Sequence, residues 1–451
     1  MSEPLSTQIV NARIVNEGEI TEGTLLFRGE RIEGINRPTP DDAAVVDAQG
    51  AWLLPGMIDD QVHFREPGFE HKANISTESR AAVAGGITSY LEMPNCNPLT
   101  INNARLADKH ARAARVSAAN YGFYLGATND NLEDVKAVDR SLACGLKIFM
   151  GASTGNMLVD DETTLENIFA STDLLVATHC EDTPMIIAAE EAASSRFGED
   201  IPFSEHPKIR SEAACYKSSS LAVSLAKRFG TRLHVLHLTT ARELELFTPG
   251  PLANKQITAE ACVHHLFFNE SSYEAKGALI KCNPAIKRVE DQSALLKAVA
   301  EDRIDVIATD HAPHTAEEKA RPYRRAPAGL PLVQHALLTL FEHVKSGVFD
   351  VPLIVRKTAH APADLFAIKD RGYLREGYYA DLVLIDDRRG ADPAALTDDA
   401  IPAPLSKCGW SPFDGFDLSA RVRKTWVNGH LRYSDGEVQP GPCGQALTYR
   451  R

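Results

Sequence analysis

Side chains of the kinds that bind metals or move protons recur at the ends of short apolar segments in the middle of the chain. They are His63, Asn95, Lys147, His179, His237 and Asp310. Imidazole nitrogens and carboxylate oxygens together suit a zinc-type divalent ion that keeps one position open for water. A single histidine at a strand end is more often a structural group than a ligand. The metal-site prediction therefore depends on several of these residues reaching one place.

Lys147 has unusual surroundings for a lysine, because it lies inside the apolar segment GLKIFM. Burial penalises the ammonium form and lowers the pKa of a lysine. The neutral amine can add carbon dioxide to give a carbamate, which is an extended carboxylate able to bridge two metal ions. From this segment alone, a buried ion pair with a neighbouring carboxylate is an equally good interpretation.

The segments that must position these residues alternate between strands and helices. Helices are expected at 77–86, 218–229 and 291–302. Strands are expected at 56–64, 87–93, 120–127, 145–150, 173–179, 232–238, 257–265 and 304–310. Eight such units predict an α/β fold, a (β/α)8 TIM-type barrel whose carboxyl strand ends meet at one mouth. An open doubly wound sheet is the alternative, but no Gly-rich phosphate loop follows the first strand.

The two ends of the chain carry alternating segments typical of β-hairpins, with N-G and D-G turn dipeptides at 428–429 and 435–436. We predict that both ends together form one small β-sandwich domain. This domain would take residues 1–55 and 373–451, and the barrel would be the insertion at 56–372.

Composition excludes several classes of protein. The 451 residues carry a net charge of −13, which disfavours nucleic acid and anionic membranes as partners. The start of the chain is not that of a secretory signal, and no segment is apolar for long enough to span a bilayer. The eight cysteines form no C-x-x-C pair, which favours buried free thiols. We expect a cytoplasmic protein with a small-molecule substrate, and a homo-oligomer is left open.

An ordered series of motifs runs from about residue 50 towards the end of the chain: PGMIDDQVHFREPG, MPNCNP, GLKIFM, ATHCED, LHVLHLTT, IATDHAPHTAEEK and GYYADLVLID. In these motifs the chain resembles the amidohydrolase superfamily and, within it, the dihydroorotases. The resemblance implies a metal-dependent hydrolase of cyclic amides in pyrimidine biosynthesis. Its reaction would be the hydrolytic opening of dihydroorotate to N-carbamoyl-L-aspartate and the reverse cyclisation.

The resemblance also implies roles for individual residues. The implied metal ligands, for one or two Zn²⁺, are His63, carboxylated Lys147 as bridge, His179, His237 and Asp310. Asp310 would also transfer protons during catalysis. Arg65, Asn95 and His314 would bind the substrate carboxylate. A guanidinium two residues after a metal-ligand histidine can bind a ring carboxylate through two hydrogen bonds.

Three positions depart from the family pattern. Gln61 occupies the place of the family's first metal histidine, and an amide oxygen is a weaker zinc ligand than imidazole. Lys147 stands where many bacterial members with the REPG motif use an aspartate from a nearby segment. The family stretch N-P-P-L-R is here NPAIK, at 283–287. His264 and His265 match a family H-H-L stretch, and we expect a supporting or structural role for them.

Two other functions stay open at this stage. Hydantoinases, dihydropyrimidinases and allantoinases open similar rings, but their substrates lack the ring carboxylate and would leave Arg65 unpaired. A non-catalytic dihydroorotase-like subunit that has lost its metal is the second alternative. Gln61 is the residue that keeps this second alternative open.

Overall fold

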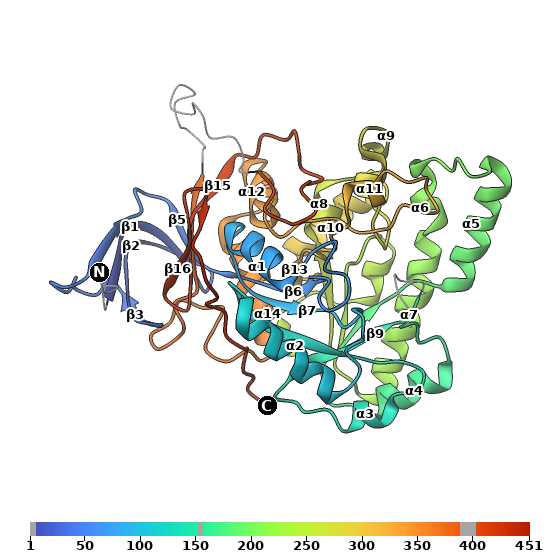
Figure 1. The fold of residues 1–451 in the computed structure, drawn as a ribbon, viewed down its shortest axis with the longest axis horizontal. Helices are drawn as coiled ribbons and strands as arrows, with labels where there is room; N and C mark the ends of the chain where they lie inside the picture. Colours follow the sequence, from blue (N-terminus) through green and yellow to red (C-terminus); the bar gives the residue numbers. More distant parts are fainter. Residues whose placement is uncertain (1–5, 152–156, 388–402) are drawn as a thin grey trace.

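The computed structural model describes residues 6–151, 157–387 and 403–451, and its central element is a parallel barrel. The barrel strands are β6 (Met57–Val62), β7 (Ile87–Glu92), β8 (Asn120–Gly126), β9 (Ala143–Phe149), β10 (Val176–His179), β11 (Leu233–Val235), β12 (Ile257–Cys262) and β13 (Val306–Ala308). They are hydrogen-bonded in chain order. A parallel bridge between Val62 and His311 closes the circle. The predicted TIM-type barrel is confirmed (Figure 1).

Strands from both ends of the chain form a second, mixed sheet beside the barrel (Figure 1). Its members are β1 (Ser6–Asn16), β2 (Glu19–Arg28), β3 (Arg31–Ile35), β4 (Ala44–Asp47), β5 (Trp52–Pro55), β14 (Leu382–Asp387), β15 (Ala420–Val427), β16 (His430–Ser434) and β17 (Glu437–Val438). β5 lies parallel to β1 on one side and antiparallel to β14 on the other. The two ends of the chain therefore meet inside one sheet.

Helices cover the outside of the barrel. They are α1 (Ile75–Ala84), α2 (Asn103–Val116), α3 (Leu132–Lys136), α4 (Glu162–Ser171), α5 (Thr183–Phe197), α6 (His206–Ile209), α7 (Glu212–Phe229), α8 (Val263–Phe267), α9 (Tyr273–Lys276), α10 (Val289–Ala300), α11 (Ala316–Lys319), α12 (Ala336–Lys345), α13 (Val351–Val355) and α14 (Ala361–Leu365). Local sequence sets their ends: Ser211 caps the first turn of α7, and Gly230 ends that helix at a φ of 71°.

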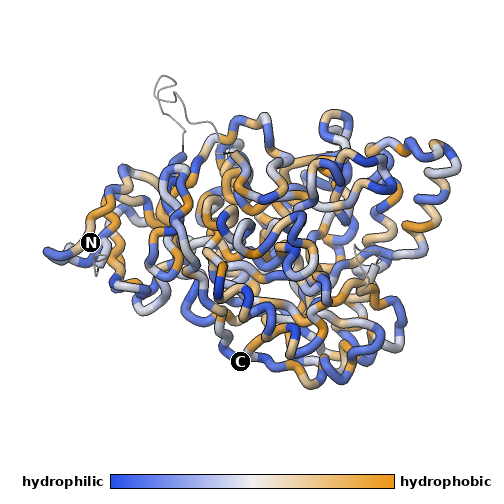
Figure 2. The backbone as a smooth tube through the Cα atoms, viewed as in Figure 1, coloured by the Kyte–Doolittle hydropathy of each residue, from blue (hydrophilic) through white to orange (hydrophobic). Residues whose placement is uncertain are grey.

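The apolar core lies inside the barrel and between the barrel and its helices. Tyr124, Leu236 and Phe366 belong to a buried cluster that fills the interior of the barrel. Figure 2 shows hydrophobic stretches along the inner strands and hydrophilic stretches at the outer turns. The lower barrel is therefore a packed core, and the cavity described below lies near the carboxyl ends of the strands.

The predicted strand at 257–265 is wrong in its last part. β12 ends at Cys262, and α8 begins at Val263, so His264 and His265 lie on a short helix. A short apolar run does not distinguish a strand from a buried helical turn, and this ambiguity explains the error. The predicted strands at 232–238 and 304–310 are also too long. β11 and β13 end two residues before His237 and Asp310.

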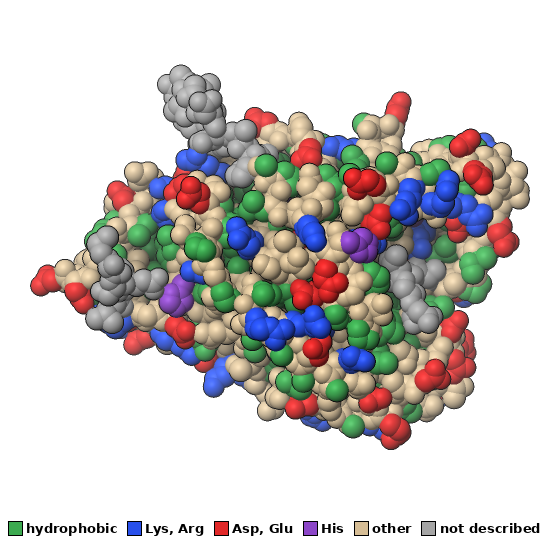
Figure 3. All heavy atoms as spheres, in the orientation of Figure 1, with side chains coloured by type: hydrophobic (Ala, Val, Ile, Leu, Met, Phe, Trp, Pro, Cys, Tyr) green, Lys and Arg blue, Asp and Glu red, His purple; other side chains and the backbone are tan. Residues whose placement is uncertain are grey.

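The surface carries charges of both signs. Figure 3 shows acidic and basic side chains interspersed over the face in view. Within the described residues, no helix is long and apolar enough to cross a membrane.

Candidate active site

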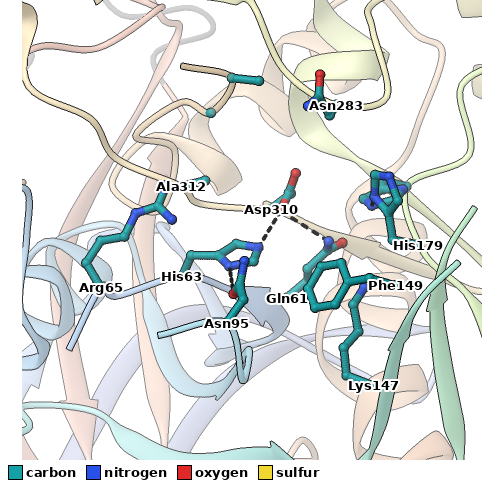
Figure 4. A pocket seen from close by; sticks show the side chains of 13 residues that line it. Gln61, His63, Arg65, Asn95, Lys147, Phe149, His179, Asn283, Asp310 and Ala312 are labelled. Atoms are coloured by element: carbon teal, nitrogen blue, oxygen red, sulfur yellow. Dashed lines mark hydrogen bonds and ion pairs between the residues drawn. The ribbon is translucent and has the colours of Figure 1, made fainter. Parts of the chain in front are cut away.

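A cavity of about 410 Å³ lies at the carboxyl ends of the barrel strands. Its lining residues are Gln61, His63, Arg65, Asn95, Lys147, Phe149, His179, His237, Asn283, Asp310, Ala312, Ala328 and Gly329. Figure 4 shows the labelled side chains among them converging on the cavity from different strands and loops. Residues spread over 269 positions of the sequence thus share one small space.

His179 and His237 form the first pair of facing ligand atoms. His179 Nδ1 lies 3.0 Å from His237 Nε2. His179 Nε2 donates to Glu181 Oε2 at 3.1 Å, so Nδ1 carries the lone pair of the neutral ring. Two nitrogens that bind one zinc ion at 2.0–2.1 Å stand roughly 3.3 Å apart in a tetrahedral site. The pair therefore fits two adjacent ligand positions of one metal centre.

Electrostatics keep both rings of this pair neutral. Burial lowers the pKa of His179, and it lowers the pKa of His237 well below the ordinary value. Burial alone would raise the pKa of Glu181, but the Arg210 guanidinium and the hydrogen bond from His179 lower it to about 2. Glu181 is therefore an anion that holds His179 in the tautomer a metal requires.

His63 and Asp310 form a second pair of facing ligand atoms. His63 Nδ1 donates to Asn95 Oδ1 at 2.7 Å, which leaves Nε2 with the lone pair when the ring is neutral. Nε2 faces Asp310 Oδ1 at 3.1 Å (Figure 4). Burial lowers the pKa of His63 and thereby favours the neutral ring. A ring lone pair and a carboxylate oxygen at this distance suit a cation between them, so this pair fits a second metal position.

Gln61 replaces an imidazole in this second position. Its Nε2 donates to Asp310 Oδ1 at 3.1 Å, and its Oε1 accepts from the thiol of Cys262, whose Sγ is 3.7 Å away. In this orientation Gln61 offers Asp310 a hydrogen-bond donor instead of offering a metal ion a lone pair. The His63–Asp310 position is thus poorer in ligands than its family counterpart.

Lys147 lies between the two pairs, and its side chain is fully buried. Among the described residues, no hydrogen-bond partner reaches its Nζ, which stands 4.6 Å from the centre of the Phe149 ring. Burial lowers the pKa of Lys147 to about 8, against the attraction of Asp310 and Glu260. A substantial fraction of the side chain is therefore a neutral amine near pH 8.

Arg65 lies at the edge of the cavity and is 8% exposed. Its Nε donates to the carbonyl of Pro313 at 3.0 Å, and its Nη2 contacts His314 Nε2 at 3.0 Å. Within the described parts of the chain it forms no ion pair with a carboxylate. A buried guanidinium without a carboxylate partner is a ready binding site for an anionic ligand.

Three site residues adopt left-handed backbone angles that are uncommon outside glycine. The φ values of Arg65, His237 and Asp310 are 69°, 40° and 52°. Each lies just beyond a barrel strand, where the chain turns away and its side chain points toward the mouth. Such strain costs about 1–3 kcal/mol per residue and is concentrated at functional sites.

A comparison with protein-family models matches residues 52–432 to the "Amidohydrolase family". The chain belongs to this family. A relative from Halobacterium salinarum, named dihydroorotase, is 34% identical over 92% of this chain and 96% of its own. Another from Bacillus cereus, also named dihydroorotase, is 31% identical over 94% of this chain and 97% of its own.

Solved structures show the same amidohydrolase fold. The L-hydantoinase of Arthrobacter aurescens superimposes with a TM-score of 0.90 at 24% identity and covers 98% of this chain and 99% of its own. The dihydropyrimidinase of Brevibacillus agri gives 0.86 at 23% identity, over 99% of this chain and 100% of its own.

In this amidohydrolase, seven of the eight predicted site residues line the one cavity, and His314 lies behind Arg65. The structure adds Glu181, Arg210 and Cys262, which we did not predict. Glu181 and Arg210 are 29 positions apart, and only the fold brings them together. His264 and His265 do not line the cavity, but they lie beside Cys262.

Proposed function

We propose that the protein catalyses the reversible hydrolysis of dihydroorotate to N-carbamoyl-L-aspartate in pyrimidine biosynthesis. Curated relatives named dihydroorotase support a hydrolase of cyclic amides. The observation that carries the substrate assignment is Arg65, a buried guanidinium at the cavity with no carboxylate partner in the described residues. Dihydroorotate differs from hydantoin and dihydrouracil in its ring carboxylate, which would pair with this guanidinium.

The chain's own residues divide the chemistry between binding and proton transfer. Arg65 would hold the ring carboxylate bidentately and thereby fix the scissile amide over Asp310. Asp310 would take a proton from the attacking water as the C–O bond forms, and give it to the ring nitrogen as the C–N bond breaks. The cycle consumes one water and leaves Asp310 in its starting state.

The cofactor would be zinc, held by His179, His237 and Lys147 at one position and by His63 and Asp310 at the other. The ligand atoms of both pairs face each other at distances that suit such an ion. When bound, it would lower the pKa of a water and polarise the amide carbonyl. Lys147, as a carbamate, would bridge the two positions. A cytoplasmic location and a homo-oligomeric state stay predictions.

The test is a substrate comparison run beside metal analysis of the same purified protein. Dihydroorotate, hydantoin, dihydrouracil and allantoin are assayed for ring opening, and carbamoyl aspartate is assayed for cyclisation. We expect turnover of dihydroorotate to exceed that of the other three rings by at least about 100-fold, since they lack the charged contact. Much faster opening of hydantoin or dihydrouracil would refute the assignment. An inactive protein without bound metal would support the non-catalytic alternative.

A further inference from the structure

Cys262, His264 and His265 form a compact group of metal-ligand side chains beside the active-site cavity. Cys262 is the last residue of β12, and the two histidines lie in the first turn of α8. The sulfur and one nitrogen of each ring all lie within 4.8 Å of one another. All three residues are buried, with exposures of 0%, 0% and 3%.

Each of the two imidazole rings has a lone pair without a hydrogen-bond partner. His265 Nε2 donates to the carbonyl of Pro284 at 3.1 Å, so its Nδ1 carries the lone pair. This Nδ1 has no hydrogen-bond partner among the described residues, and the His264 ring makes no close hydrogen bond there either, although the backbone of Thr309 lies near it. An unpaired polar atom in a buried place costs about 1–3 kcal/mol. One available lone pair on each ring, both beside one thiol, indicates that a ligand belongs there.

We propose that Cys262, His264 and His265 bind one divalent ion of the zinc type. A thiolate and two imidazoles are softer donors than those of magnesium or calcium sites and match zinc. With bonds of about 2.0–2.3 Å, a tetrahedral ion needs its ligand atoms roughly 3.3–3.6 Å apart. The distance between any two ligand atoms of the group therefore has to shorten by no more than about 1.5 Å. Small side-chain rotations are enough for this change.

Gln61, one of the three positions that depart from the family pattern, offers a fourth donor. Gln61 Oε1 lies 3.7 Å from Cys262 Sγ, close to the separation of oxygen and sulfur on one tetrahedral ion. The carboxamide oxygen that Gln61 turns away from Asp310 therefore lies next to the sulfur of the proposed site. This ion is additional to the two positions described above, and its existence does not depend on the substrate of the enzyme.

Cobalt substitution tests the proposal through a spectroscopic signal that the two metal positions of the active-site cavity cannot give. Their ligands are nitrogen and oxygen, whereas a cobalt–thiolate bond produces an intense near-ultraviolet charge-transfer band. The metal-free full-length protein is titrated with Co²⁺, and the absorption spectrum and bound equivalents are recorded together. We expect the band in the wild type, and its loss in Cys262→Ser together with one equivalent of metal.

Two cysteine variants serve as controls. Cys282→Ser removes the thiol that lies 3.6 Å from His265 Nε2, and Cys215→Ser removes a buried thiol on α7. Both should keep the band at wild-type intensity. His265→Ala should keep a weaker band and lower the affinity for Co²⁺ at least about 10-fold.

X-ray absorption on the zinc-loaded wild type needs no variant and guards against misfolding of Cys262→Ser. We expect one sulfur neighbour at about 2.3 Å in part of the bound zinc. The proposal is overturned if fully loaded wild-type protein shows neither sulfur scattering nor the cobalt band. It is also overturned if the band survives in folded Cys262→Ser or disappears in Cys282→Ser.

Discussion

Asn95 Oδ1 lies 2.7 Å from His63 Nδ1, so a side chain predicted to bind substrate holds the ring of a predicted metal ligand. The hydrogen bond fixes the His63 tautomer with the lone pair on Nε2, opposite Asp310. We therefore expect binding of the substrate and retention of a metal to be coupled through one amide.

Removing this amide should weaken the metal position and not only the binding of substrate. We expect Asn95→Ala to lower the metal affinity of the His63–Asp310 position by roughly 10- to 100-fold, as loss of a partner behind a ligand does. Asn95→Asp keeps an acceptor and should retain the metal. Competitive chelator titration measures both, and Asn103→Ala, at a half-buried asparagine on α2 outside the cavity, is the control. Unchanged retention in Asn95→Ala would show that the hydrogen bond has no such effect.

Lys147→Ala should abolish hydrolysis, because the two metal positions lose their predicted anionic bridge. A short carboxylic acid added to the buffer should restore part of the activity by occupying the space left by the carbamate. Activity is measured with and without the acid, and the gain should follow its concentration. A Lys147→Ala enzyme as active as the wild type would disprove the bridging role.

Arg65→Met should lower kcat/KM for dihydroorotate and leave the metal content unchanged. The lost contact is charged, bidentate and largely buried, which makes it worth on the order of 3 kcal/mol or at least about 100-fold in rate. Steady-state kinetics and metal analysis of the same preparation separate the two effects. If metal is lost together with activity, Arg65 acts by supporting the metal site.

Gln61→His should strengthen the weaker of the two active-site positions, because it restores an imidazole next to His63. In the wild type we expect brief chelation to remove one active-site equivalent first, with activity falling in parallel. The missing imidazole costs at least roughly 10- to 100-fold in affinity. The bound metal equivalents are counted in a Cys262→Ser background, so that the proposed third ion does not contribute. Two equally retained equivalents, unaffected by Gln61→Ala, would contradict this expectation.

A buried histidine below the site should make stability depend on pH. Burial alone would lower the pKa of His234, but the carboxylates of Asp60 and Glu260, 3.2 and 3.8 Å from its Nε2, raise it to about 9. The folded state therefore holds this proton more tightly than the unfolded chain, whose histidine has a pKa near 6.5. The stabilisation, roughly 3 kcal/mol, is fully present below pH 6.5 and is lost as the pH rises through 9.

Thermal unfolding of the wild type and of His234→Gln between pH 6 and pH 10 measures this contribution. The wild type should lose stability relative to the variant as the pH rises through this range. Parallel curves for the two proteins would show that His234 carries no such proton.

Much of the barrel could be predicted from sequence, because each strand is a short apolar segment followed by a polar residue at the mouth. His179 and Asp310 could be located in the same way, whereas the role of Arg65 was implied only by the family resemblance. Glu181 was not predicted, since its importance comes from Arg210 and from the neutral ring of His179, which a linear pattern does not contain. For Cys262 the sequence predicts only a buried free thiol, because its contact with Gln61 joins positions 201 residues apart.

Pairing between β5 and β14 also has a consequence for synthesis on the ribosome. Leu54 of β5 pairs with Val383 of β14, so one edge of β5 has no neighbour until the translated chain has passed that residue. At about 5–20 residues per second, this interval lasts roughly 15 to 65 seconds. During it the nascent protein exposes an unpaired, apolar strand edge, the kind of surface that chaperones protect and that otherwise aggregates. The exposure of this edge therefore ends with β14, before β15, β16 and β17 have been translated.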